Sequence, residues 1–306
     1  MLEKPLVTVV IPTYKRSVEF LSRAVSSVLQ QTYPHVELIV VDDSPSDFRQ
    51  RPAVAQYMKT LENDRIVYLQ NEKNVGGSLA RNRGIDAANG EYITFLDDDD
   101  EYLPEKIAHQ VCFMQQEDCD LSFSDMTMYN NADRVVDFRN YTDIPAFDTQ
   151  SLLRYHLMKH MTGTPTFMYK TSKLREIGGF EDAKMGQEFY LMLKSIERGL
   201  KISYLPRCDV KIYKHADGGI TQGRNKIDGE NRLFEFKKQY FPVLSPREIR
   251  FITFRHWAVM AVAYKRNRQL YAIPYAGIRA FLASPIDFFT QIARFFKKIQ
   301  SAKHGR

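Results

Sequence analysis

Apolar residues in the first 100 positions alternate between short continuous runs and stretches with helical spacing. Leu6–Ile11 is a continuous β-branched run, which is typical of a strand buried on both faces of a sheet. A helix from Ser17 to about Gln30 follows, with apolar residues on one stripe. The same pattern predicts strands at 37–41, 65–70 and 91–96 and helices at 52–62 and 79–88. This alternation predicts an α/β fold with a doubly wound, mostly parallel sheet.

The pattern is less regular after residue 100. It predicts helices at 105–116, 147–159 and 189–198, and strands at 121–123, 127–129, 164–169 and 210–215. Further on, Ser245-Pro246-Arg247-Glu248 reads as a capping box that opens a helix to about Arg266. A last helix is expected from 285 to about 299. We therefore expect an α/β domain over residues 1–220 and a helical appendage over residues 221–306.

Charge is distributed unevenly along the chain. The 306 residues carry a net charge of +6. Residues 245–306 hold twelve Lys/Arg against two Asp/Glu, which gives +10, whereas the first 244 residues hold 31 basic against 35 acidic residues, which gives −4. An anionic surface would therefore bind the C-terminal part of the chain.

The last predicted helix pairs an aromatic face with basic residues. Its apolar members are Phe288, Phe289, Ile292, Phe295, Phe296 and Ile299, and its basic members are Arg294, Lys297 and Lys298. This pattern predicts peripheral contact with the inner face of the cell membrane. A helix packed on the protein or in a dimer interface is the alternative. No RNA-binding motif accompanies the basic residues, so we expect no nucleic acid partner.

The remaining composition indicates a cytoplasmic protein. Three cysteines without a C-x-x-C pair argue against a disulfide framework or a zinc site and favour a reducing compartment. The chain opens directly on its first strand pattern without a signal sequence. It also lacks an apolar stretch of about 18 residues that could span a bilayer as a simple helix.

Four consecutive carboxylates, Asp97–Asp100, follow the strand predicted at 91–96. Such a run is often solvated surface, but a divalent cation with oxygen ligands would equally relieve the repulsion. Its place after an apolar strand favours a ligand site, because open α/β sheets bind ligands at the carboxyl ends of their strands. No G-x-G-x-x-G or P-loop pattern occurs. Asp42-Asp43 end another strand. Together with the acidic run they predict a site that binds a nucleotide through its base and ribose, while a metal ion binds its phosphates.

Four segments in order resemble family 2 glycosyltransferases of the GT-A fold. They are VVIPTYKR (9–16), VVDDSPSD (40–47), NVGGSLARNRGIDAANGEYITFLDDDD (74–100) and IGGFEDAKMGQEFYLMLK (177–194). Members of this family use nucleotide sugars to build surface polysaccharides. The resemblance implies metal-dependent, inverting transfer from a UDP-sugar to a saccharide or lipid-linked acceptor. The alternative is a non-catalytic saccharide- or nucleotide-binding relative of the same fold.

The resemblance also implies roles for residues at the first two strand ends. Pro12, Thr13 and Tyr14 would line the nucleobase pocket, with Arg16 nearby. Asp43 would accept a hydrogen bond from the base and so select uracil. A turn that opens before Ser44-Pro45 is the alternative for both Asp42 and Asp43.

Phosphate, metal and sugar contacts would come from later segments. Lys73 and Arg81 would approach the diphosphate, and Gly178-Gly179 would lie under the donor sugar, unless the glycines form a simple turn. In the acidic run, Asp97 and Asp98 would contact the nucleotide, while Asp99 and Asp97 would bind Mg²⁺ or Mn²⁺. His215 is a further candidate metal ligand. Relatives often have Ser or Ala where this chain has Asp98.

The catalytic candidate is Glu188, in the first turn of the helix near 189–198. An inverting transfer needs a carboxylate to take the proton of the acceptor hydroxyl. Family members most often have Glu-Asp where this chain has Gln187-Glu188, so the resemblance assigns the base to Glu188. The alternative is an acidic residue that only stabilises the helix N-terminus.

Overall fold

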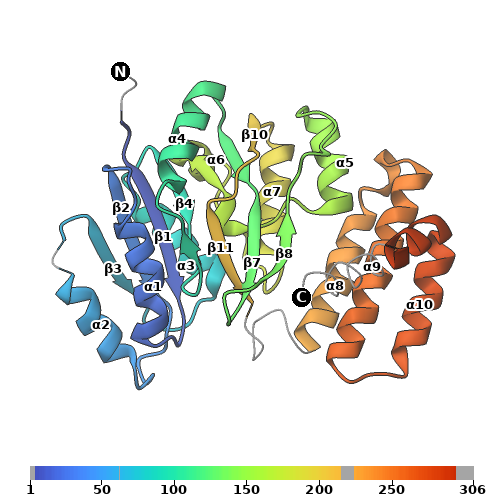
Figure 1. The fold of residues 1–306 in the computed structure, drawn as a ribbon, viewed down its shortest axis with the longest axis horizontal. Helices are drawn as coiled ribbons and strands as arrows, with labels where there is room; N and C mark the ends of the chain where they lie inside the picture. Colours follow the sequence, from blue (N-terminus) through green and yellow to red (C-terminus); the bar gives the residue numbers. More distant parts are fainter. Residues whose placement is uncertain (1–3, 62, 215–223, 294–306) are drawn as a thin grey trace. The chain divides into compact units, whose positions relative to one another are not determined.

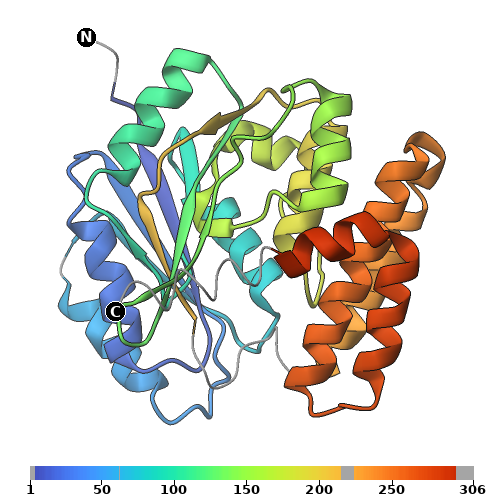
Figure 2. The same cartoon turned by 45° about the vertical axis from the view of Figure 1, so that its right-hand side comes forward.

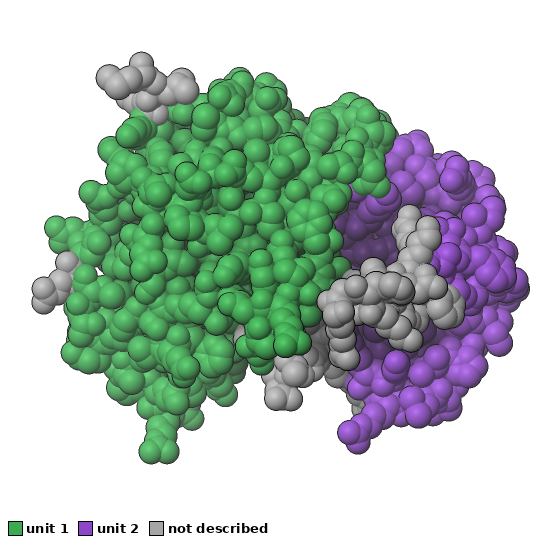
Figure 3. Space-filling model, in the orientation of Figure 1, with its two compact units in different colours: residues 1–153, 161–216 green, residues 154–160, 217–306 purple. Residues whose placement is uncertain are grey.

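The computed structural model describes residues 4–61, 63–214 and 224–293. The chain divides into two compact units, coloured separately in Figure 3. The first unit comprises residues 1–153 and 161–216, and the second comprises residues 154–160 and 217–306. Each unit is described below by itself.

The first unit is built on a seven-stranded sheet (Figure 1). Its strand order is β10-β6-β9-β4-β1-β2-β3, and every pairing is parallel except those of β9, which runs antiparallel to β4 and β6. The strands are β1 (Val7–Thr13), β2 (Val36–Asp42), β3 (Ile66–Gln70), β4 (Tyr92–Phe95), β6 (Leu121–Ser124), β9 (Met168–Lys170) and β10 (Ile202–Leu205). This arrangement confirms the predicted α/β fold with a mostly parallel sheet.

Helices cover both faces of this sheet (Figure 2). They are α1 (Val18–Leu29), α2 (Arg51–Thr60), α3 (Gly77–Ala87), α4 (Lys106–Glu117), α6 (Thr171–Glu176) and α7 (Gln187–Glu197), whereas α5 (Thr149–Lys159) is divided between the two units at residue 154. Alternate residues of a strand face opposite sides. Val7, Val9 and Ile11 of β1 pack in one core cluster with buried residues of α1, α2 and α4, whereas Val10 faces α3. The continuous apolar run of β1 is therefore explained by burial on both faces.

A second, smaller sheet has the order β5-β11-β7-β8. Its strands are β5 (Glu101–Tyr102), β11 (Val210–Lys214), β7 (Met126–Asn130) and β8 (Val135–Arg139). The sequence does not predict β8, because its Val135, Val136 and Phe138 are exposed and give no buried face. The strand predicted at 164–169 begins too early. A short 3₁₀ turn, η1 (Thr164–Thr166), precedes β9 there.

The second unit contains α8 (Arg224–Lys238), the 3₁₀ turn η2 (Phe241–Val243), α9 (Pro246–Arg266) and α10 (Ala272–Ala283). The predicted capping box is present: Ser245 Oγ accepts the N–H of Glu248 at 3.3 Å, and the Glu248 carboxylate accepts the N–H of Ser245 at 2.7 Å. Residues 285–293 are helical, as expected, whereas the apolar pattern does not predict α10. Within the described ranges, no helix is long and apolar enough to cross a membrane.

Candidate functional site

The ends of three adjacent parallel strands form the candidate site. β1 lies between β2 and β4, so the carboxyl ends of all three meet at one edge of the sheet. Thr13 at the end of β1 is in register with Asp42 at the end of β2, and the Asp97–Asp100 run follows β4 after Leu96. The structure therefore brings together the two acidic strand ends at the edge where such sheets bind ligands.

Asp98 and Asp99 share one arginine. The buried Asp98 carboxylate accepts hydrogen bonds from Thr13 Oγ1 at 2.7 Å and from Arg16 Nε at 2.9 Å. The same guanidinium pairs through Nη2 with Asp99 at 2.5 Å. Burial raises the pKa of Asp98 to about 6, although the Arg16 charge opposes this shift. Arg16, expected beside the nucleobase, thus also neutralises the middle of the acidic run.

The outer members of the run contact different parts of the first unit. Asp97 pairs with Arg81 Nη2, and Arg81 Nη1 also donates to Gln187 Oε1 at 2.8 Å. Asp100 is buried and accepts the backbone N–H of Tyr213 at 2.9 Å. Burial and the charges of the neighbouring aspartates hold the pKa of Asp100 well above its usual range. The four carboxylates therefore have distinct surroundings.

Arg23 of α1 fixes the backbone of the acidic run. Its Nη2 donates to the carbonyl oxygen of Asp99 at 2.7 Å, and its Nε lies 3.0 Å from a carboxylate oxygen of Glu101. The guanidinium also stacks over the Tyr213 ring, 4.2 Å from the ring centroid. No sequence signal identifies this residue, because Arg23 occupies an ordinary polar position of an amphipathic helix.

Asp42 forms the turn after β2. Its Oδ1 accepts the N–H of Ser44 at 2.9 Å, and its Oδ2 accepts the Tyr68 hydroxyl at 2.6 Å. A carboxylate that accepts the backbone N–H two residues later is the usual Asx-turn arrangement. The turn interpretation therefore accounts for Asp42.

Asp43 organises the loop after β3. Its Oδ1 accepts from Asn71 Nδ2 at 2.7 Å and from the N–H of Val75 at 2.9 Å, while Oδ2 accepts the N–H of Gly76 at 2.8 Å. Gly76 has a φ of +90°, which favours glycine at this point. A carboxylate offers about four acceptor positions, so these three bonds leave one on Oδ2 for a further donor.

Other predicted nucleotide contacts lie at the same edge and differ in exposure. Tyr14 is exposed directly after β1, and Lys73 is exposed in the loop that Asp43 holds. Arg81 is buried in α3, where a side chain at position 77 would place its Cβ 3.1 Å from Arg81 Nη1. Glycine at 77 therefore leaves room for the Arg81 guanidinium.

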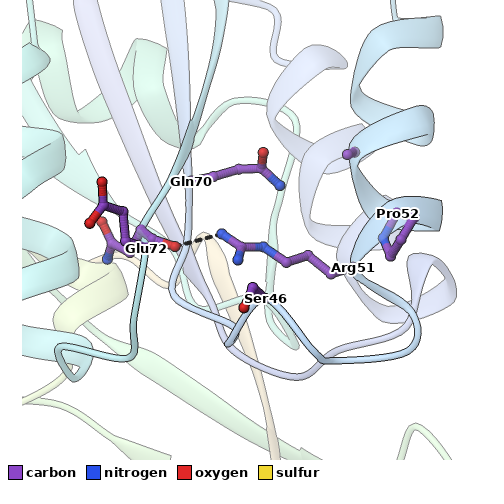
Figure 4. A pocket seen from close by; sticks show the side chains of 7 residues that line it. Ser46, Arg51, Pro52, Gln70 and Glu72 are labelled. Carbon is purple, nitrogen blue, oxygen red and sulfur yellow. Dashed lines mark hydrogen bonds between the residues drawn. The ribbon is translucent and has the colours of Figure 1, made fainter.

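A hollow of about 570 Å³ lies beside the end of β3. Its lining residues are Ser46, Arg51, Pro52, Ala55, Gln70, Asn71 and Glu72. Figure 4 shows Arg51 reaching from α2 toward the loop after β3, where its Nη2 donates to the Asn71 carbonyl oxygen at 2.6 Å. The hollow thus shares Asn71 with the Asp43 network, although none of the predicted site residues lines it.

Gly178 and Gly179 end the turn after α6. Both have left-handed backbone, with φ of +79° and +58°. A Cβ at Gly179 would lie 2.5 Å from Asn82 Oδ1, and Asn82 hydrogen-bonds the Phe180 N–H and carbonyl oxygen, each at 2.8 Å. The Phe180 ring in turn lies under the Arg81 guanidinium at 5.6 Å. Turn geometry therefore requires these glycines, and their contact with a donor sugar stays a prediction.

Glu188 lies half-buried in the first turn of α7. The preceding residue, Gln187, ties this turn to the acidic run through Arg81. Among the described residues, the Glu188 carboxylate has no hydrogen-bond or ion-pair partner. Burial raises the pKa of Tyr141 to about 12, with smaller contributions from the charges of Asp125 and Glu188, so this phenol lies within electrostatic range of both carboxylates.

The metal expectation has mixed structural support. His215 lies outside the described residues. In the part of the chain that the structure describes, no group of three or more His, Cys, Asp and Glu side chains is arranged to hold a metal ion. Asp97 and Asp99 nevertheless have side chains that are 38% and 19% exposed, and carboxylate oxygens suit Mg²⁺ or Mn²⁺. Two carboxylates fit such a cation if diphosphate oxygens complete the coordination.

Comparison with solved structures identifies the class of fold. The crystal structure of S. aureus TarS 1-349 in complex with UDP-GlcNAc superimposes with a TM-score of 0.61 at 18% identity, over 92% of this chain and 80% of that one. This similarity confirms the GT-A-type fold.

The family follows from the sequence match. The glycosyl transferase family 2 model matches residues 8–178, so the chain belongs to this family and is a glycosyltransferase. The non-catalytic alternative is therefore set aside.

Two curated relatives are each 40% identical over the aligned region. The putative teichuronic acid biosynthesis glycosyltransferase TuaG of Bacillus subtilis aligns over 121 residues, which are 40% of this chain and 46% of TuaG. The GalNAc(5)-diNAcBac-PP-undecaprenol beta-1,3-glucosyltransferase of Campylobacter jejuni aligns over 100 residues, or 32% of this chain and 31% of that enzyme. Each alignment spans less than half of the relative.

Proposed function

We propose that this glycosyltransferase moves a sugar from a UDP-sugar onto a saccharide or lipid-linked acceptor in surface polysaccharide synthesis. The observation that carries the proposal is the acidic strand edge, where Asp97–Asp99 meet Arg16 and Arg81. The UDP-GlcNAc bound to TarS supports a nucleotide-sugar donor. The names of the Bacillus and Campylobacter relatives refer to teichuronic acid and to an undecaprenol-linked substrate, which supports these acceptor classes.

The uridine would bind at the ends of β1 and β2. The exposed ring of Tyr14 offers a stacking surface for the base, next to Pro12 and Thr13. The remaining acceptor position of Asp43 would take the N–H of uracil, while its other bonds hold the carboxylate in place. Because those bonds pre-organise Asp43, base recognition costs little further ordering.

The diphosphate would bind beside the acidic run. Asp97 and Asp99 would hold Mg²⁺ or Mn²⁺, which when bound acts as a Lewis acid and stabilises the departing nucleoside diphosphate. Arg16 and Arg81 neutralise these carboxylates in the structure. With a cation on Asp97 and Asp99, Arg16 Nη2 and Arg81 Nη2 would be available to pair with phosphate oxygens, together with the exposed Lys73, while Arg16 Nε stays on Asp98.

Glu188 would act as the base of an inverting transfer. Its carboxylate takes the proton of the acceptor hydroxyl as that oxygen attacks the anomeric carbon. The bond from the anomeric carbon to the diphosphate breaks, and its electron pair leaves with UDP. A half-buried carboxylate without a partner among the described residues is suited to this step, because no protein donor must be displaced first.

Donor hydrolysis by the purified full chain tests this proposal. UDP-, GDP- and dTDP-sugars are compared with Mg²⁺, with Mn²⁺ and with EDTA. We expect nucleoside diphosphate release from UDP-sugars, dependent on the metal. Preferred release from a GDP- or dTDP-sugar would overturn the uridine assignment, and unchanged release in EDTA would overturn the metal assignment.

We also propose that the enzyme works in the cytoplasm at the inner face of the cell membrane. The undecaprenol-linked substrate in the name of the Campylobacter relative supports this location, because such a lipid stays in the bilayer. Peripheral contact would come from the basic C-terminal helices. Of the basic residues expected to make it, Arg294, Lys297 and Lys298 lie outside the described residues.

A further inference from the structure

The helix α10 of the second unit is apolar on two opposite sides. Its twelve residues carry one charge, Arg279. Ala276 and Ala280 are buried on one side, and Ala276 belongs to a core cluster with Ile227 of α8 and Met260 of α9. Small residues at this spacing bring α10 close to α9. This side of α10 therefore makes the buried contacts with α8 and α9.

The opposite side of α10 carries large apolar residues that are more than half exposed, and at its edge the Tyr275 ring also meets the ring of Trp257 of α9, with centroids 5.4 Å apart. Tyr271, Tyr275, Ile278 and Leu282 recur at i, i+4, i+7 and i+11 and are 83%, 54%, 59% and 69% exposed. With 3.6 residues per turn, these positions form one stripe, and Ala276 and Ala280 lie across the helix from it. We call these four residues the α10 stripe. Soluble surfaces rarely present such a continuous apolar row without a partner.

Charge around the α10 stripe is basic. Residues 265–293 contain four basic side chains, Lys265, Arg266, Arg268 and Arg279, and one acidic side chain, Asp287. The Asp287 carboxylate accepts the hydroxyl of Ser284 at 2.6 Å, so it is engaged at the start of the next helix. Exposed Lys265 and Arg266 end α9, and exposed Arg268 follows in the turn before α10. An anionic partner is therefore favoured.

We propose that the α10 stripe inserts into an anionic lipid surface, with α10 lying in the plane of the interface. This inference rests on the proposed function, because it names the surface that would hold the enzyme at its membrane-bound acceptor. The amphipathic rings of Tyr271 and Tyr275 suit the interface between headgroups and acyl chains, where the apolar side chains of Ile278 and Leu282 can also be buried. A second copy of the chain is a poorer occupant, because its own Lys265, Arg266 and Arg268 would bring like charges together.

Vesicle co-sedimentation of the full chain tests the proposal. The vesicles are pure phosphatidylcholine and an equal mixture of phosphatidylcholine and phosphatidylglycerol. We expect binding to the mixed vesicles that weakens with added salt, because the basic residues contribute a screened attraction. Ile278→Gln with Leu282→Gln should lower the partition coefficient about tenfold or more, since each change removes a large apolar side chain from the interface.

Val243→Gln is the matched control, since Val243 is about as exposed but belongs to η2 and not to the stripe. Unchanged binding by the α10 double variant would overturn the proposal, and so would the absence of sedimentation with either vesicle. Light scattering tests the alternative of a dimer. If the wild type is a dimer and the double variant is a monomer, the stripe makes contact between two copies of the chain. Donor hydrolysis in solution is measured on the same proteins. Loss of vesicle binding with normal hydrolysis would contradict only the membrane proposal. Loss of hydrolysis with normal vesicle binding would contradict only the proposed function.

Discussion

At the scale of single residues, two arginines decide the state of the acidic run. Arg16 pairs with Asp98 and Asp99, and Arg81 pairs with Asp97, so three carboxylates are compensated by protein cations. The fourth carboxylate, Asp100, is buried and accepts the backbone N–H of Tyr213. Its raised pKa favours the protonated form. The two arginines and the raised pKa of Asp100 therefore lower the repulsion among the four adjacent aspartates. Their sequence alone could not distinguish these roles, because the partners come from segments far away in the chain.

A substitution at Asp99 separates metal binding from folding. We expect Asp99→Asn to lose metal-dependent donor turnover and to keep its melting temperature within about 2 °C, because the side chain lies partly exposed outside the core. Asp47→Asn is the matched control, since Asp47 is exposed near the same edge. Activity and thermal unfolding are measured on both. Normal turnover by Asp99→Asn in the presence of EDTA would contradict the assignment.

Glu188 permits a test of the chemical step alone. We expect Glu188→Gln to bind UDP-sugar as the wild type does and to lose about 10²- to 10⁴-fold in kcat, because the amide cannot take the acceptor proton. Glu181→Gln, an exposed carboxylate ahead of α7, should leave both quantities unchanged. Calorimetric titration gives donor affinity and steady-state assays give kcat. An unchanged kcat would place the base elsewhere.

At the scale of helices and strands, burial decided which predictions succeeded. The sequence correctly predicts β1, β2 and β4, because strands buried on both faces read as continuous apolar runs. It misses β8, whose valines and phenylalanine face solvent, and α10, whose two apolar sides leave no polar face to mark a helix. The spacing around Glu188 predicts the start of α7. The bond from Gln187 to Arg81 that fixes this start depends on tertiary contact and was not predictable.

Two mid-helix glycines should respond oppositely to alanine. In α3, a Cβ at Gly84 would lie 2.4 Å from Val10 Cγ1, so Gly84→Ala should destabilise the first unit by about 1–3 kcal/mol through overpacking. In α10, a Cβ at Gly277 meets nothing within 4 Å, so Gly277→Ala should gain about 0.5–1 kcal/mol from helix propensity. Urea unfolding followed by circular dichroism measures both. Equal midpoints for the two variants would contradict the close packing of α3 on β1.

At the scale of the whole molecule, the two units differ in how they respond to acid. In the first unit, burial raises the pKa of Asp125, so this carboxyl binds a proton more readily in the folded form and contributes stability as the pH falls. In the second unit, burial lowers the pKa of His256 to about 4 and holds the pKa of His160 well below its usual range. These histidines are neutral when folded, so acid favours the unfolded form there.

The second unit should therefore lose stability first on acidification. His256 takes up its proton near pH 6.5 when unfolded but near pH 4 when folded, so its contribution is intact above pH 6.5 and is lost progressively toward pH 4. Glu230 and Glu235 oppose the shift, whereas Lys237 and Lys238 add to it. The only tryptophan, Trp257, contacts the His256 ring with centroids 5.0 Å apart and reports on this unit.

The measurement is urea unfolding followed by Trp257 fluorescence at pH 7 and pH 5. We expect a lower midpoint at pH 5 for the wild type and a smaller difference for His256→Phe. The phenyl ring can keep the stack on Phe234, where the His256 ring now lies 4.1 Å away, and it cannot accept a proton. His256 Nδ1 is buried without a hydrogen-bond partner among the described residues, so the change removes no bond at that atom. If His256→Phe shows the full wild-type loss between the two pH values, the acid sensitivity of this unit comes from other groups, with His160 the next to substitute.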